Sequence, residues 1–239
     1  MLHNVLWTSG WESTYRVVDL ILNKKEEVQP YYILDNKRVS SKVEINTMKK
    51  IKRMLIEQDP EAENLLKDTI VFNIRDIPKD EELTSNYYNL ANRSHLGGQY
   101  DWLARFAKSE GLDDLELCIH RDDKAGDFIL DDIITTEDKC GFKLRDELSY
   151  PELNLFSYFR FPLFEVSKLE IEQKAKEYGF SHIMEETWFC HSPVNNKPCG
   201  LCNPCKYTIE EGLGRRVPNP TLKNKVVIFS RKVKNKLFK

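Results

Sequence analysis

The chain has 239 residues, of which 41% are hydrophobic and 31% are charged, and its formal net charge is −2. This length suits one α/β domain with an appendage, and the near-neutral charge argues against a nucleic acid as the main partner. No apolar run approaches the ~20 residues that span a bilayer. The first seven residues lack the charged start and the cleavage site of a signal peptide. We therefore expect a cytoplasmic protein with no membrane partner.

Strand-like and helix-like segments alternate along the first half of the chain. In chain order, apolar spacing predicts a strand at 3–8, a helix at 13–24, a strand at 28–34, a helix at 43–58 and a strand at 69–74. Residues 75–97 show no clear period and are expected to form a loop, before a helix at 100–109 and a strand at 115–120. This alternation predicts an α/β fold with a Rossmann-like, doubly wound parallel sheet, which binds ligands beyond the carboxyl ends of its strands.

The second half of the chain is less regular. Residues 121–155 are acidic and are expected to form an insertion or a lid. A helix is predicted at 167–178, because Ser167 can cap it and Glu170, three residues later, completes a capping box. The stretch from 223 to 239 holds seven basic residues and no acidic one. We expect it to be a solvated tail or an edge strand, the alternative being a contact with phosphate or RNA.

The spacing of four cysteines indicates a metal site. Two further cysteines, Cys118 and Cys140, stand alone, and in a reducing compartment a tight cluster favours metal over disulfides. Two overlapping C-x2-C steps and one preceding cysteine give the four thiolates that Zn²⁺ binds in closed, structural sites. The predicted ligands are Cys190, Cys199, Cys202 and Cys205. The alternatives are His191 as a ligand, an iron–sulfur cluster, or a chance group of buried cysteines.

A turn of small and polar residues joins the first predicted strand to the first helix: Thr8, Ser9, Gly10, Trp11, Glu12, Ser13 and Thr14. Backbone N–H groups at such a helix start attract an anion, and the helix dipole adds to the attraction. The Ser13 and Thr14 hydroxyls can donate further hydrogen bonds to phosphate oxygens. An ordinary helix start with Ser and Thr caps is the alternative. A Walker-type site is disfavoured, because the turn lacks the glycine run and the lysine.

The turn resembles the PP-loop signature S-G-G-x-D-S/T of the ATP pyrophosphatases. Gly10 and Ser13 match the signature, whereas Thr8 stands for its Ser, Ser9 for its first Gly and Glu12 for its Asp. The run from Glu186 to Cys190, followed by C-G-x-C-x-x-C, resembles the C-terminal zinc module of one PP-loop family, the 7-cyano-7-deazaguanine synthases. The segments 92–93, 120–123, 161–163 and 167–171 also resemble parts of that family, and residues 121–155 resemble it least. The chain thus resembles a divergent member.

This resemblance implies a PP-loop nucleotide-binding domain at 1–180 and a zinc knuckle with a basic tail at 181–239. It implies that residues 8–14 bind ATP with Mg²⁺, and that Ser13, Lys168 and Arg93 act in catalysis. The deazaguanine substrate would be bound by Arg93, His120, Asp122, Glu186 and Trp188, with Phe128 as a second stacking candidate. Each of these residues also has an ordinary explanation, such as a surface lysine, a loop salt bridge or a core aromatic.

The family's chemistry supplies the expected function. A deazaguanine carboxylate is adenylated by ATP, captured by ammonia as an amide, and dehydrated to a nitrile after a second activation. A homodimer is expected by analogy. One alternative keeps the adenylation but changes the acceptor to another amine, such as a protein N-terminus in an antiviral system. Another alternative is a catalytically inactive nucleotide-binding scaffold, in which the basic tail serves as a docking element.

Overall fold

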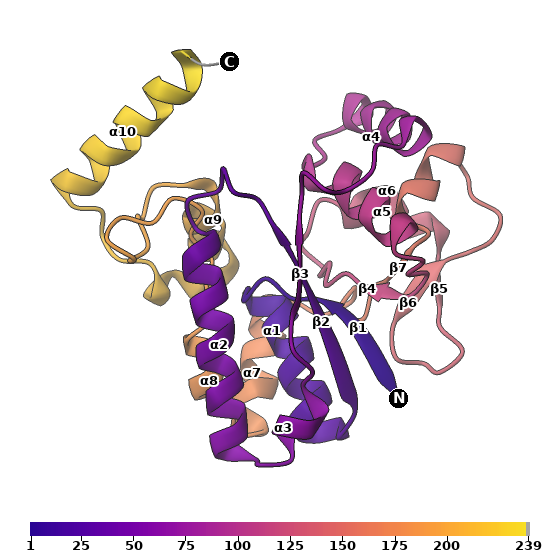
Figure 1. Cartoon of the computed structure of the whole chain (residues 1–239), viewed down its shortest axis with the longest axis horizontal. Coiled ribbons are helices and arrows are strands. Elements are labelled where there is room, and N and C mark those ends of the chain that lie inside the picture. The colour runs from indigo at the N-terminus through magenta and orange to yellow at the C-terminus, as the bar shows by residue number, and fades with distance from the viewer. Residues whose placement is uncertain (238–239) are drawn as a thin grey trace.

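The computed structural model describes residues 1–237, except the side chains of residues 232 and 234–237; Lys239 of the predicted basic tail also lies outside the described residues. Five strands form one parallel sheet in the order β3-β2-β1-β4-β7 (Figure 1). The strands are β1 (Leu2–Leu6), β2 (Glu27–Leu34), β3 (Ile70–Asn73), β4 (Leu115–Glu116) and β7 (Phe159–Arg160). The strand order reverses between β1 and β4, which confirms the predicted doubly wound α/β fold.

Helices cover both faces of the sheet (Figure 1). On one face lie α1 (Trp11–Val18), α2 (Ser41–Gln58), α3 (Ala62–Leu65), α7 (Lys168–Glu177) and α8 (Ser181–Glu185). On the other face lie α4 (Glu81–Arg93), α5 (Gln99–Ser109) and α6 (Gly126–Ile129). Each face has its own buried apolar cluster, one containing Val18 and Phe180 and the other Leu83 and Phe106. The predicted helix at 13–24 begins earlier, at Trp11, and its end is a π-helical turn, η1 (Asp19–Lys24).

The expected loop at 75–97 is wrong, because α4 fills its centre. Asp80 caps this helix, its Oδ1 atom accepting a hydrogen bond from the Leu83 N–H at 2.9 Å. Leu83 and Leu90 are buried, and Tyr87 packs half-buried against the same cluster. Their spacing of four and three residues is that of a helix with one apolar face. Polar residues surround this narrow face and weaken its periodic signal.

Residues 121–155 are not a detached lid, since they complete the core on the α5 face. The segment contains α6, η2 (Leu130–Asp132), β5 (Ile133–Thr135), β6 (Phe142–Leu144) and η3 (Pro151–Phe156). Ile129, Leu144 and Phe156 are buried in the same cluster as Leu83. β5 and β6 form a separate antiparallel hairpin, and Phe142 bridges to Phe161 just after β7.

Two parts of the chain follow the sheet. The first is the segment 190–216, which carries the four clustered cysteines and is called the cysteine module, and the second is a last helix. Together they contain α9 (Asn203–Thr208), the π turn η4 (Ile209–Leu213), η5 (Gly214–Arg216) and α10 (Leu222–Leu237). Of the two expectations for the basic stretch, a solvated tail or an edge strand, the edge strand is wrong for the described residues, because they form α10, which stands apart from the sheet (Figure 1). None of the helices described for residues 1–237 has both the length and the apolar character needed to cross a membrane.

Candidate functional site

A cavity of about 540 Å³ lies between the carboxyl end of the sheet and the cysteine module. Its walls come from the loop after β1, the loop after β4, the start of α7, and the segment around α9 and η4. The loops after β1 and β4 meet where the strand order reverses, the place where doubly wound sheets bind ligands. The cavity is therefore the candidate site.

The loop after β1 leaves the start of α1 open. Ser9 adopts the left-handed region with φ 58°, and its carbonyl accepts a hydrogen bond from the Trp188 N–H at 2.7 Å. Gly10 occupies the N-cap position and offers no side-chain cap, so N–H groups of the first turn are available to an anion. Ser13 is buried, and its Oγ atom accepts from the Thr8 N–H at 3.4 Å. The Thr14 hydroxyl accepts from the Trp7 indole N–H at 3.0 Å and lies outside the cavity lining.

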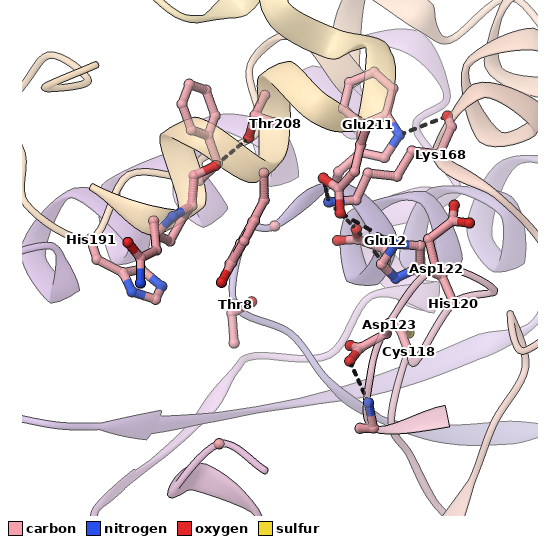
Figure 2. A pocket seen from close by; sticks show the side chains of 18 of the residues that line it. Thr8, Glu12, Cys118, His120, Asp122, Asp123, Lys168, His191, Thr208 and Glu211 are labelled. Atoms are coloured by element: carbon pink, nitrogen blue, oxygen red, sulfur yellow. Dashed lines mark hydrogen bonds and ion pairs between the residues drawn. The ribbon is translucent and has the colours of Figure 1, made fainter. Parts of the chain in front are cut away.

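Four charged or titratable side chains meet beside this loop (Figure 2). Lys168, the first residue of α7, places its Nζ atom 2.8 Å from Glu12 Oε1 and 2.6 Å from Glu211 Oε2. His120 lies within 3.9 Å of Glu12 and 3.7 Å of Glu211, and its buried Nε2 atom has no hydrogen-bond partner among the described residues. Residues from both ends of the chain thus form one cluster.

The pKa shifts in this cluster follow from burial and from the neighbouring charges. Burial alone would lower the pKa of Lys168, but Glu12 and Glu211 outweigh it and raise that pKa. Burial alone would raise the pKa of Glu12 and of Glu211, but Lys168 and His120 lower both. Burial alone would lower the pKa of His120, but Glu211 and Glu12 raise it. At neutral pH the cluster therefore holds a cationic lysine between two carboxylates.

Aromatic rings and a buried arginine form another part of the cavity lining, and the Trp11 indole N–H donates to the Lys168 carbonyl at 3.3 Å. The Arg216 guanidinium lies 4.8 Å from the centre of the Trp11 ring and 5.3 Å from that of Phe189. It donates to the Thr187 carbonyl at 2.6 Å and to the Thr187 hydroxyl at 2.7 Å. Burial lowers the pKa of Arg216 to about 10, partly offset by Glu185, so the group stays cationic at neutral pH. A flat, anionic ligand fits such a wall.

The cysteine module forms part of the cavity wall and carries a candidate metal site. The Sγ atoms of Cys190, Cys199, Cys202 and Cys205 all lie within 4.8 Å of one another. Three of these cysteines are fully buried, as a shielded metal centre requires. His191 is not part of this group and instead lines the cavity. Cys118 also lines the cavity, but burial raises the pKa of its thiol, which disfavours a nucleophilic thiolate.

The structure brings many, though not all, of the predicted site residues together. Those lining the cavity are Thr8, Gly10, Trp11, Glu12, His120, Asp122, Lys168 and Trp188. Arg93 lies elsewhere, 3.1 Å from Glu152 and over the Tyr150 ring. Glu186 pairs with Lys50 outside the cavity lining, and Phe128 packs against the core on the α5 face.

Several residues of the cavity were not predicted as site residues, among them Glu211, Arg216 and Asp123. Glu211 and Arg216 come from the end of the cysteine module, and Asp123 comes from the loop after β4. Burial raises the pKa of Asp123, although its Oδ1 atom accepts a hydrogen bond from the Ala125 N–H at 3.0 Å. Glu211 and Arg216 belong to no motif. The acidic run around Asp123 was the one available signal.

Comparison with known families finds a kinship for one segment of this chain. Residues 153–213 match the family model of the queuosine biosynthesis protein QueC. Over this segment the chain is similar to QueC. The matched segment contains Lys168, the four clustered cysteines and Glu211, whereas the loop after β1 lies outside it. The resemblance noted in the motifs is thereby confirmed.

Other comparisons add little to this kinship. No curated protein matches the QueC-like chain. Among solved structures, it aligns with the U34-tRNA thiolase NcsA from Methanococcus maripaludis, determined with its 4Fe-4S cluster. The two chains are 14% identical, with a TM-score of 0.45, and the alignment covers 93% of this chain and 74% of the thiolase.

Proposed function

We propose that this QueC-like chain adenylates the carboxylate of a 7-deazaguanine-type substrate with ATP and transfers the acyl group to ammonia. The observation that carries the proposal is the open start of α1 beside Lys168, in a cavity at the β1–β4 switch point. The QueC family match supports the same chemistry, because it includes Lys168 and the cysteine module.

The start of α1 is the proposed phosphate site. Its N–H groups and its dipole favour a polyphosphate, and Gly10 leaves them free of a side-chain cap. Glu12 and Asp122 line the same cavity and would repel a bare polyphosphate. Carboxylate oxygens are also the ligands that Mg²⁺ prefers, so these two residues suit a magnesium ion that neutralises the phosphate charge.

Lys168 is the proposed catalytic cation. In the first step, a substrate carboxylate oxygen bonds to the α-phosphorus of ATP, and the bond from that phosphorus to the pyrophosphate oxygen breaks. Pyrophosphate leaves with the electron pair, and Lys168, kept cationic by Glu12 and Glu211, offsets its charge. Ammonia then attacks the acyl carbon, AMP leaves, and a proton is released to water. A second ATP then adenylates the amide oxygen with release of pyrophosphate, and loss of AMP and of both amide protons gives the nitrile.

The part of the lining formed by Trp11, Phe189 and Arg216 is the proposed position of the base. Trp11 and Phe189 offer ring faces, and Arg216 offers a cation for a substrate carboxylate. Trp188 lines the cavity as well, and its indole N–H donates to the Cys190 carbonyl at 2.7 Å. The cysteine module therefore holds Trp188, one of the candidate stacking residues, in place.

The spacing of the thiolates favours zinc as the metal. Neighbouring Sγ atoms are 3.8 Å apart for Cys190 and Cys202 and 3.9 Å apart for Cys199 and Cys205. Four bonds of ~2.3 Å around a tetrahedral zinc ion place sulfur atoms about 3.8 Å apart. An iron–sulfur cubane holds its cysteines much farther apart, because four iron atoms lie between them. We therefore propose a closed zinc site that stabilises the cavity wall.

Pyrophosphate release tests the proposed enzyme. Purified chain is incubated with ATP, Mg²⁺ and 7-carboxy-7-deazaguanine, with and without ammonium, and the products are identified by mass spectrometry. Replacing Lys168 by Ala is expected to lower the rate roughly 100-fold, the scale for losing one charge-stabilising group. The matched control is Lys174→Ala, an exposed lysine on the same helix. Equal rates for the two variants would remove Lys168 from the mechanism.

The same assay separates the alternatives. Pyrophosphate release without amide or nitrile indicates another amine acceptor, such as a protein N-terminus. ATP binding with no pyrophosphate release under any condition indicates an inactive scaffold. Amide or nitrile formed only when ammonium is present supports the proposed function.

A further inference from the structure

One face of α10 anchors the helix to the cysteine module. The Asn224 side chain donates to the Cys199 carbonyl at 3.1 Å, and the Arg231 guanidinium donates to the Pro193 carbonyl at 2.9 Å. Ile228, between them, is buried in the apolar cluster of the cysteines. These residues recur every three or four positions, so they lie on one side of the helix. The module therefore holds α10 in a fixed place.

The opposite face of α10 is apolar and open. Its large side chains are Leu222, which is 80% exposed, Val226 at 68%, Phe229 at 70% and Val233 at 42%. They are four, three and four residues apart, the spacing of the core positions of a coiled coil. At 3.6 residues per turn the four positions fall within about 60° of one another. The face is a narrow seam that the described part of the chain leaves uncovered.

The charged residues of α10 are all basic. All 38 acidic residues of the chain precede Gly212, whereas nine basic residues follow it. Lys223 and Lys225 are exposed and flank the seam on its two sides in the heptad pattern. A second α10 packed against the first would place lysines beside lysines, which disfavours pairing. A helix with carboxylates at the flanking positions would instead complement the seam.

We propose that α10 is a docking helix for an acidic amphipathic helix of a partner protein. The partner's apolar residues would pack on Val226 and Phe229, and its carboxylates would pair with Lys223 and Lys225. A membrane surface is less suited, because an interfacial helix buries a broad apolar face, and here the opposite side is held by the cysteine module. A nucleic acid duplex is less suited, since its phosphate backbone would contact the cations and leave the apolar seam uncovered.

Two synthetic peptides test this proposal with the full chain. Both carry three heptads with leucine at the core positions; one has glutamate at the flanking positions and the other has lysine. Fluorescence anisotropy of the labelled peptides is expected to show binding of the acidic peptide about tenfold or more tighter than that of the basic one. The Val226→Ser/Phe229→Ser variant should lose this binding. The Lys223→Glu/Lys225→Glu variant should prefer the basic peptide.

The controls make the result decisive. Tyr88→Ser removes another exposed aromatic, on α4, and should bind like the wild type. Thermal melts establish that each variant is folded. Equal binding of the two peptides would overturn the proposal. Binding to phosphatidylserine-containing vesicles that depends on Phe229 would favour a membrane instead. A dimer in light scattering that the Val226→Ser/Phe229→Ser variant dissociates would favour a second copy.

Discussion

Glu116 on β4 joins three elements through buried charges, and its removal should cost much of the stability of the fold. Its carboxylate accepts from Arg16 on α1 at 2.6 and 2.7 Å and lies 2.8 Å from His3 on β1. The Glu116 and Arg16 side chains are each only 4% exposed. Glu116→Ala leaves the Arg16 cation buried without its partner, which costs about 3–5 kcal/mol. In a chain of this size that loss corresponds to a drop of about 6–20 °C in Tm.

Urea unfolding at pH 7, followed by tryptophan fluorescence, measures this loss. Glu27→Ala is the control, since Glu27 pairs with Lys67 at 2.6 Å on the surface and its loss should leave the midpoint unchanged. The combined variant Arg16→Met/Glu116→Leu should recover most of the lost stability, because it removes both charges. If Glu116→Ala behaved like Glu27→Ala, the argument from the buried pair would be refuted.

The pH dependence of this loss has a definite sign. Burial alone would raise the pKa of Glu116, but the hydrogen bonds from Arg16 and His3 outweigh it and lower that pKa. A carboxyl whose pKa is lower in the folded state stabilises the fold above its unfolded pKa of about 4.3. That stabilisation disappears as the pH falls through the folded value. The gap between wild type and Glu116→Ala should therefore narrow below about pH 4.

Three further predictions concern α4 and the cysteine module. Leu83→Ala should lower the free energy of unfolding, measured in urea, by about 2–5 kcal/mol, because Leu83 is fully buried. A negligible loss would show that α4 does not pack on the core through Leu83. Gly200→Ala should lower the metal content per chain, measured by inductively coupled plasma mass spectrometry. Gly200 has φ 71°, and an added Cβ would lie 2.6 Å from the Pro218 carbonyl oxygen, so the turn between two of the cysteines would be distorted. Gly111→Ala, at φ 65° with open space around it, should keep the metal. Chelation should lower the melting temperature and expose Cys190 and Cys205 to thiol reagents, and unchanged melting would contradict a structural metal site.

The parts of the fold predictable from the sequence are those specified by residues close together in the chain. The capping box of α7 is present as predicted, with the Ser167 N–H donating to Glu170 at 2.7 Å, because both partners lie within one helical turn. The parallel sheet follows from the alternation of strands and helices. α4 was missed although Asp80, Leu83 and Leu90 carried its signal, because the apolar face is too narrow to dominate its polar surroundings.

The site was harder to predict because its contacts cross the whole chain. Glu12 and Glu211 share Lys168, yet no local pattern relates residues so far apart. Glu211 also lies on a π turn, whose spacing differs from the regular helical period. Arg93 and Arg216 look alike in sequence, but only the fold places Arg216 among the aromatic rings of the cavity.

Ser9 occupies a backbone conformation that glycine adopts more easily, at a position where the PP-loop signature carries glycine. Its carbonyl is fixed by the Trp188 N–H, while its hydroxyl is buried with no hydrogen-bond partner among the described residues. The bend thus has a left-handed residue without the glycine that adopts this conformation most easily. A search for the glycine letters of the signature would pass over this bend, whereas a search for its backbone torsion angles would find it.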